Sequence, residues 1–181
     1  MGLRPPQPPF SDWPVQLTLP SGYIWYTEPH VFVTQTHIEH ATILDTLAMS
    51  EKIDAAMRLR KAETAKYGGL LIIHDWRNLK TWDPDARQAL IDRAIARGRG
   101  TRRGIVIAID VNPVFRMLAH VANATLAAVG AARVQLVDTL EPVMEKYAVK
   151  KPKYGARFPF DGERSELDSI PPRVPSSRPR E

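Results

Sequence analysis

The chain has 181 residues, which is long enough for one domain with a proper core and too short for two. Its net charge is +5, and 44% of its residues are hydrophobic. It has no cysteine, which excludes disulfides, thiolate metal sites and thiol catalysis and is compatible with a reducing cytoplasm. The start of the chain has no apolar stretch of signal-peptide type, and no segment reaches the roughly 20 apolar residues of a membrane span, so we expect a soluble, cytoplasmic protein.

The positive charge is spread along the chain. Its densest cluster is the run of residues 97–103, which we interpret as a solvated turn whose charges favour the preceding helix end, or as a contact for an acidic partner. We therefore do not expect nucleic acid as a partner. An anionic membrane surface is a weaker alternative to a protein partner.

Prolines mark both ends of the chain. Of the 16 prolines, six lie within the first 20 residues and six beyond residue 151. Proline fixes φ and removes a hydrogen-bond donor, so we predict a Pro-rich N-terminal arm over residues 1–20, an α/β domain over 21–150 and a disordered, basic, Pro-rich tail over 151–181. Phe10 and Trp13 are candidates to hold part of the arm on the core.

The first predicted elements are two strands, a long helix and a third strand. Residues 23–26 and 31–34 are β-rich runs. Residues 42–66 contain no proline or glycine and are rich in helix-forming residues, which predicts one long helix that ends before Gly68. The continuous apolar run 70–73 predicts a strand covered on both faces.

Two pairs of a capping residue and a proline mark the next helix starts. Asp83 before Pro84 predicts an N-cap acid followed by proline at the first helical position. Asn112 before Pro113 repeats this arrangement and opens an apolar helix over residues 114–129.

Two further apolar runs, 105–109 and 134–137, are predicted as strands, and Asp138 to Glu141 has the spacing of a capping box that opens a last helix. The predicted order is β-β-α-β-α-β-α-β-α. The fold class is therefore α/β, with a single mainly parallel sheet of about five strands covered by about four helices.

Three successive predicted strands end in an acid: Asp75, Asp110 and Asp138. Ligands of open α/β sheets bind outside the carboxyl ends of the strands, so these acids could share one rim and bind a cation or act as general acid or base. The alternative is that they cap helices and stabilise tight turns. No dinucleotide fingerprint or P-loop is present, and His37 with His40 supplies too few ligands, so we expect no cofactor and no metal.

Two tryptophans, Trp76 and Trp82, bracket the loop after the third strand, with Arg77 between them. Tryptophan is over-represented at interfaces, so this loop is a candidate partner-binding surface. The alternative is that both rings pack inward beneath the loop.

The element order over residues 22–148 and the segment 71–87 resemble the STAS family of anti-sigma-factor antagonists. In that family, an acid ends the strand, and a second acid precedes two serines and a glycine that open a helix. The resemblance places Asp75 at the first acid and Asp83 at the second. Pro84 and Asp85 then stand in place of the serines.

The resemblance implies a regulatory module that binds another protein, and related domains bind apolar ligands. Family members are switched by phosphorylation of the serine, which neither Pro84 nor Asp85 allows. Asp85 could supply a permanent charge, about half that of a phosphate. We therefore expect a domain that is locked in one state or takes another input, and a regulated phosphosite at Thr81 would contradict this.

The helix over residues 114–129 is apolar on most sides, so we expect it to be buried, to line a ligand cavity or to mediate self-association as a dimer.

We predict a non-enzymatic regulatory protein-interaction module, with the partner-binding residues Trp76, Arg77, Trp82, Asp83 and Asp85. The alternative is a carrier or sensor of a lipid-like or anionic small molecule. An enzyme that uses the strand-end acids is the least favoured interpretation.

Overall fold

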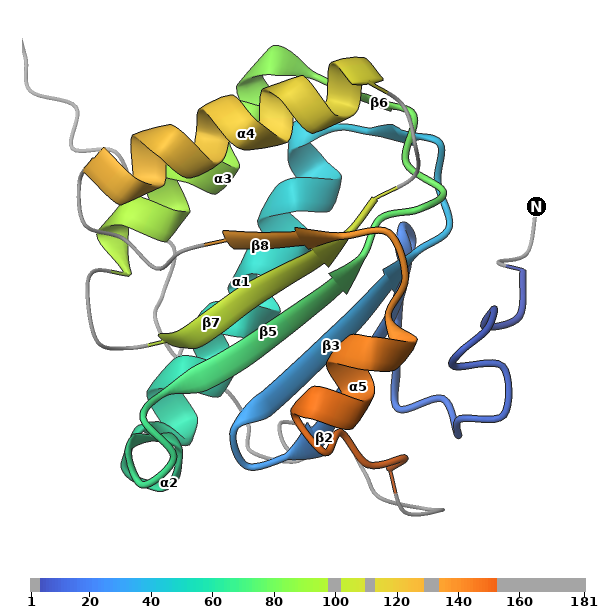
Figure 1. The fold of residues 1–181 in the computed structure, drawn as a ribbon, viewed down its shortest axis with the longest axis vertical. Helices are drawn as coiled ribbons and strands as arrows, with labels where there is room; N and C mark the ends of the chain where they lie inside the picture. The colour runs from blue at the N-terminus through green and yellow to red at the C-terminus, as the bar shows by residue number, and fades with distance from the viewer. Residues whose placement is uncertain (1–3, 98–101, 110–112, 129–133, 153–181) are drawn as a thin grey trace, which may run out of the picture.

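The computed structural model describes residues 4–97, 102–109, 113–128 and 134–152 (Figure 1). Within these residues, the main sheet has six strands in the order β1-β2-β3-β5-β7-β8. The strands are β1 (Leu17–Leu19), β2 (Gly22–Glu28), β3 (Val31–Thr36), β5 (Leu70–Asp75), β7 (Arg102–Ala108) and β8 (Val134–Val137). The first three run antiparallel to one another, and β3, β5, β7 and β8 are parallel.

A second, two-stranded sheet pairs β4 (His40–Ala41) with β6 (Thr81–Trp82). It joins the segment after β3 to the segment after β5, at the carboxyl ends of these strands. The main sheet confirms the α/β class and the mainly parallel arrangement, but the prediction of a single sheet is wrong, because β4 and β6 form a second one. The strand count exceeds the predicted one because β1, β4 and β6 are too short to produce a sequence pattern.

The described helices are α1 (Ile43–Leu59), α2 (Lys61–Ala65), α3 (Pro84–Ala96), α4 (Pro113–Ala128) and α5 (Glu141–Lys146). Helix α1 packs on α3 and α3 on α4, and α5 lies on the opposite face of the sheet from α1 (Figure 1). No helix among the described residues is both long and apolar enough to cross a membrane.

Both faces of the sheet are buried, and β5 shows this most clearly. Its residues alternate between two clusters, with Leu70 and Ile72 packing toward α1 and Leu71 and Ile73 toward α5. Successive side chains of a strand point to opposite faces, so a strand covered on both sides reads as a continuous apolar run. The sequence prediction of a doubly covered strand at 70–73 is confirmed.

Residues 4–16 lie against the face of the sheet that carries α5. The side chains of Phe10 and Trp13 are 0% and 6% exposed and pack with Trp25 of β2 at ring-centroid distances of 5.2 and 5.6 Å. The indole nitrogen of Trp25 donates a hydrogen bond of 3.0 Å to the Pro14 carbonyl. The N-terminal segment therefore forms part of the core over β2, while α5 covers the neighbouring strands.

Two predicted helices differ from the observed ones. The helix predicted over residues 42–66 is interrupted at Arg60, whose backbone leaves the helical region (φ −110°, ψ 21°) between α1 and α2. The capping box predicted from Asp138 to Glu141 is wrong, because α5 begins after Leu140 without a side-chain cap. The Asp138 carboxylate is instead paired with Arg116 of α4.

Candidate functional site

The strand-end acid Asp75 is buried and fully engaged. Its side chain is 3% exposed and accepts hydrogen bonds of 2.8 Å from Nε and from Nη2 of Arg77 and from Nε2 of Gln35. A buried carboxylate is tolerated only when it is paired and hydrogen-bonded in this way. Asp75 therefore serves as a structural anchor at the end of β5.

The same polar network holds the N-terminal segment in place. Arg77 donates a second bond through Nη2 to the Pro8 carbonyl at 2.6 Å, and Gln35 exchanges two amide bonds with the backbone of Gln7 at 2.7 and 3.1 Å. The hydrogen bond to Asp75 raises the pKa of the Arg77 guanidinium. The predicted binding residue Arg77 thus ties the segment of residues 4–16 to the loop after β5, with 30% of its side chain exposed.

The other two predicted strand-end acids do not extend this site. Asp138 is 67% exposed at its side chain and forms its own ion pair with Arg116. Asp110 lies outside the described residues. Among the residues that the structure describes, no three His, Asp or Glu side chains lie close enough together to hold a metal ion.

Asp83 occupies the N-cap position of α3, as predicted, but its side chain does not cap the helix. The carboxylate instead contacts His40 of β4, with 3.0 Å between Oδ1 and Nε2. The other ring nitrogen of His40 lies 2.7 Å from the hydroxyl of Thr81. A long-range contact between β4, β6 and α3 has therefore replaced the local cap.

An imidazole between a carboxylate and a hydroxyl is also the arrangement that activates a nucleophile in hydrolases. Such catalysis needs N–H donors for the oxyanion. The backbone N–H groups of Thr81 and Asp83 already donate to the carbonyls of Glu39 and Ala41. These contacts align β4 with β6, so the N–H groups of Thr81 and Asp83 are engaged in the small sheet.

The two tryptophans of the loop pack against each other and differ in exposure. Trp76 is 4% exposed, whereas Trp82 is half-buried, and their ring centroids lie 4.9 Å apart in an edge-to-face arrangement. Trp76 also stacks on His74 of β5, whose Nδ1 lies 2.8 Å from the hydroxyl of Thr34. Trp76 therefore supports the loop from beneath, and Trp82 is the ring that reaches the surface.

Burial sets the protonation state of His74. Removal of the ring from water lowers its pKa to about 3, and the positive charge of Arg97 acts in the same direction. The His74 imidazole is thus neutral in the core, where it stacks on the ring of Trp76.

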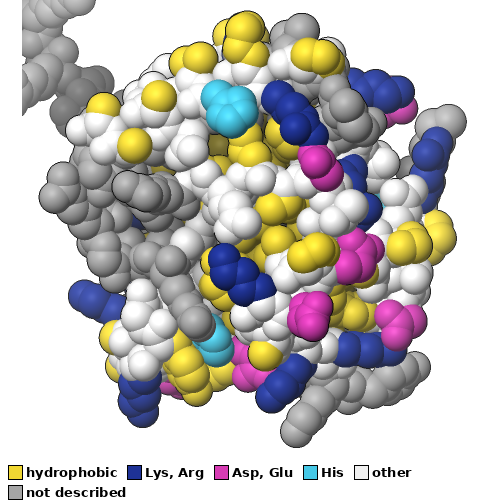
Figure 2. Space-filling view, in the orientation of Figure 1, with side chains coloured by type: hydrophobic (Ala, Val, Ile, Leu, Met, Phe, Trp, Pro, Cys, Tyr) yellow, Lys and Arg dark blue, Asp and Glu magenta, His cyan; other side chains and the backbone are white. Residues whose placement is uncertain are grey.

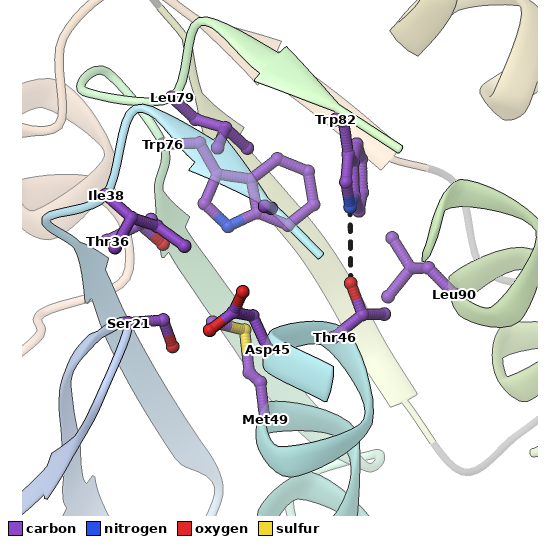
Figure 3. A pocket seen from close by; sticks show the side chains of 11 residues that line it. Ser21, Thr36, Ile38, Asp45, Thr46, Met49, Trp76, Leu79, Trp82 and Leu90 are labelled. Atoms are coloured by element: carbon purple, nitrogen blue, oxygen red, sulfur yellow. Dashed lines mark hydrogen bonds between the residues drawn. The ribbon is translucent and has the colours of Figure 1, made fainter. Parts of the chain in front are cut away.

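A small pocket lies beside Trp76, between the loop, the end of β3 and the first turns of α1 (Figure 3). Its volume is about 30 Å³. It is lined by Ser21, Thr36, Ile38, Ala41, Asp45, Thr46, Met49, Trp76, Leu79, Trp82 and Leu90. Of these residues, the sequence prediction named only the two tryptophans.

The polar residues of the pocket gave no sequence signal. Thr36 is an ordinary strand residue, and its hydroxyl is buried without a hydrogen-bond partner. Asp45 forms a capping box with Thr42, but Asp stands in place of the usual Glu or Gln, so the local pattern does not indicate it. The pocket is assembled by tertiary contacts, since its lining extends from Ser21, just before β2, to Leu90 of α3.

The site thus consists of a buried anchor at Asp75, an exposed start of α3 with Asp83, Asp85 and Trp82, and a small pocket beneath the loop between them. Comparisons of the chain with protein-family models, with curated proteins and with solved structures give no match.

Proposed function

We propose that this chain is a non-enzymatic, cytoplasmic regulatory module of STAS-like type that binds another protein at the start of α3. The observation that carries the proposal is the pair of acids at the start of this helix, one at the N-cap and one in the first turn. Asp83 contacts His40 and keeps 38% of its side chain exposed, and Asp85 is exposed beside it. Both lie next to the half-buried Trp82, which gives the surface an aromatic anchor with an acidic rim.

This surface is smaller than the one expected from the sequence. Trp76 is too deeply buried to form part of the outer surface at the start of α3, and Arg77 is occupied by Asp75 and by the Pro8 carbonyl. We therefore assign direct contact to Trp82, Asp83 and Asp85 and a supporting role to Trp76 and Arg77. The partner that fits this acidic surface presents basic side chains.

The input that regulates the module is not phosphorylation at the family's serine position. Pro84 and Asp85 occupy it, and Oδ1 of Asp85 accepts a hydrogen bond of 2.9 Å from the Ala86 N–H. A fixed negative charge in the first turn is favoured by the helix dipole. The module is accordingly proposed to be locked in its charged state.

A binding experiment tests this assignment. We expect the wild-type chain, tagged and incubated with native lysate, to retain a partner that Asp85→Arg loses at least tenfold, because the change reverses the charge at the contact. Asp92→Arg is the matched control, since Asp92 is an exposed acid toward the other end of α3 and, among the described residues, its side chain bonds to Gln88 of the same helix. Equal retention by all three chains, or equal loss in both variants, would count against this surface.

Self-association through α4 is a second proposed contact. The outer side of this helix exposes Met117 and Val121 at 59% and 60%. Figure 2 shows hydrophobic side chains gathered along the edge of the molecule that α4 forms in Figure 1. Exposed apolar surface of this kind is typical of an interface.

Sensing of a small molecule is the second candidate function, and the pocket beside Trp76 favours it. A volume of about 30 Å³ is far below the roughly 300–1,000 Å³ of a pocket that holds a whole drug-sized ligand. The pocket thus suits the head of a small molecule better than a lipid chain.

A further inference from the structure

The pocket beside Trp76 contains polar groups that the fold leaves without partners. The hydroxyl of Thr36 is buried without a hydrogen bond, and the residue is 3% exposed. Native proteins rarely leave buried polar atoms unpaired, because each unpaired atom costs about 1–3 kcal/mol. Because this hydroxyl belongs to a residue that lines the pocket, a molecule in the pocket can supply its missing hydrogen bond.

Three other polar groups of the pocket are also available. Oδ2 of Asp45 accepts two bonds from Thr42, at 2.7 and 3.0 Å, but among the described residues no donor contacts Oδ1. Likewise, no described residue accepts a hydrogen bond from the indole N–H of Trp76 or bonds to the hydroxyl of Ser21. In Figure 3 the indole nitrogen lies on the edge of the ring that faces Ser21 and Asp45.

The mixture of donors and acceptors restricts the chemistry of the occupant. The Asp45 carboxylate repels an anionic head. A cationic ammonium head carries donors alone and cannot accept from the Trp76 N–H. A neutral head that both donates and accepts satisfies the carboxylate, the indole and the hydroxyl of Thr36 together.

The size and the walls restrict it further. One water needs roughly 10–15 Å³, so a pocket of about 30 Å³ holds two to three water-sized groups, which matches the head of a small ligand. The apolar walls are formed by Ile38, Met49, Leu79 and Leu90, which suit a short aliphatic group.

We propose that this pocket binds a primary carboxamide head with a short aliphatic tail, whose carbonyl accepts from Trp76 and Thr36 and whose NH₂ donates to Asp45. This inference does not depend on the partner surface at the start of α3. The carboxamide belongs either to a free small molecule or to a glutamine or asparagine side chain of a partner.

Titration with matched three-carbon probes tests the chemistry. We expect propionamide to shift the indole N–H signal of Trp76 saturably in nitrogen–proton NMR spectra, with a dissociation constant of the order of 1 mM for so small a ligand. Propionate and propylammonium have the same number of carbon atoms and carry charges, and we expect neither to saturate the signal. An absent shift with propionamide, or an equal shift with all three probes, overturns the proposal.

Variants identify the pocket as the site. Thr36→Val removes the hydroxyl at nearly constant volume, so we expect it to weaken propionamide binding about fivefold. Thr27→Val is the matched control, because the Thr27 hydroxyl is also buried and unpaired but does not line the pocket. We expect this control to bind within twofold of the wild type, and equal binding by Thr36→Val would refute the assignment. If Thr36→Val does not fold, Thr36→Ala, which also removes the hydroxyl, serves in its place with at least the same expected loss.

One further probe separates the two sources of the carboxamide. N-acetylglutamine methylamide presents the same head on a peptide. Binding at least as tight as that of propionamide would assign the site to a partner's side chain, and weaker binding would assign it to a free small molecule.

Discussion

At the scale of single residues, the core of this domain is defined by buried polar groups and by how each is paired. Asp75 is held by Arg77 and Gln35, and His74 contacts Thr34 and stacks on Trp76. Burial of such groups is costly unless every one has a partner, so these contacts also fix which backbone segments meet. Asp75 could be recognised from the sequence as a strand-end acid, but its role could not, because the contacts of Arg77 reach across 69 positions to Pro8.

His74 makes the stability of the fold dependent on pH. Its pKa is about 3 in the folded state, against an ordinary value of 6.5, so between these values the unfolded chain binds a proton that the folded chain does not. Folding is therefore weakened as pH falls below 6.5, by about 1.4 kcal/mol of unfolding free energy per pH unit at most. Urea unfolding at pH 7.5, 6 and 5 measures this slope.

The His74→Asn variant is the control for this prediction, because asparagine cannot take up the proton. We expect its unfolding free energy to vary less with pH than that of the wild type over the same range. The same slope in both proteins would assign the acid sensitivity to other groups.

At the scale of elements, the N-terminal segment departs most from what its composition suggests. Its prolines are poor material for a helix or a sheet, yet β1 lies at the edge of the sheet and Phe10 is fully buried. Proline content opposes regular structure but does not oppose burial of an aromatic ring. Residues 4–16 are held by Phe10, Trp13 and the polar contacts of Arg77, so they behave as part of the fold.

Truncation of this anchor should destabilise the whole domain. We expect Phe10→Ala to lower the free energy of unfolding by about 3–5 kcal/mol, because the ring packs between Trp13 and Trp25 and leaves a cavity when removed. Denaturant unfolding measures the loss. Val15→Ala, at a side chain that is 52% exposed in the same segment, should change stability by less than about 0.5 kcal/mol. A loss below about 1 kcal/mol for Phe10→Ala would show that the segment is not part of the cooperative unit.

At the scale of the whole molecule, the two faces of the sheet are covered differently. One face is covered by α1, α3 and α4, and the other by α5 with the N-terminal segment (Figure 1). The covering is complete over β5 but leaves apolar side chains of α4 on the outside, with Met117 and Val121 more than half exposed. The molecule therefore has a buried core and one apolar edge that a second copy can cover.

Sedimentation velocity tests self-association through α4. We expect the wild-type chain to form a dimer at micromolar concentration and Val121→Glu to shift it to the monomer, because a charge in an apolar contact stays unpaired. Leu44→Glu is the matched control, since Leu44 is 75% exposed and belongs to a different helix, α1. A wild-type monomer at high concentration, or a monomer with both variants, would contradict the proposal.

The sequence by itself determined the class and the layered order of this fold, because apolar runs and proline-marked caps are local signals. The runs at 70–73 and 105–109 are doubly buried strands, and α3 begins at Pro84 as predicted. The tertiary structure alone decided the side-chain contacts of the site. The carboxylate of Asp83 contacts His40 instead of capping its own helix. Thr36, Asp45 and Trp76 line one pocket, although they come from three different segments. Such contacts depend on which elements become neighbours in the folded sheet, and no local pattern in the chain records that.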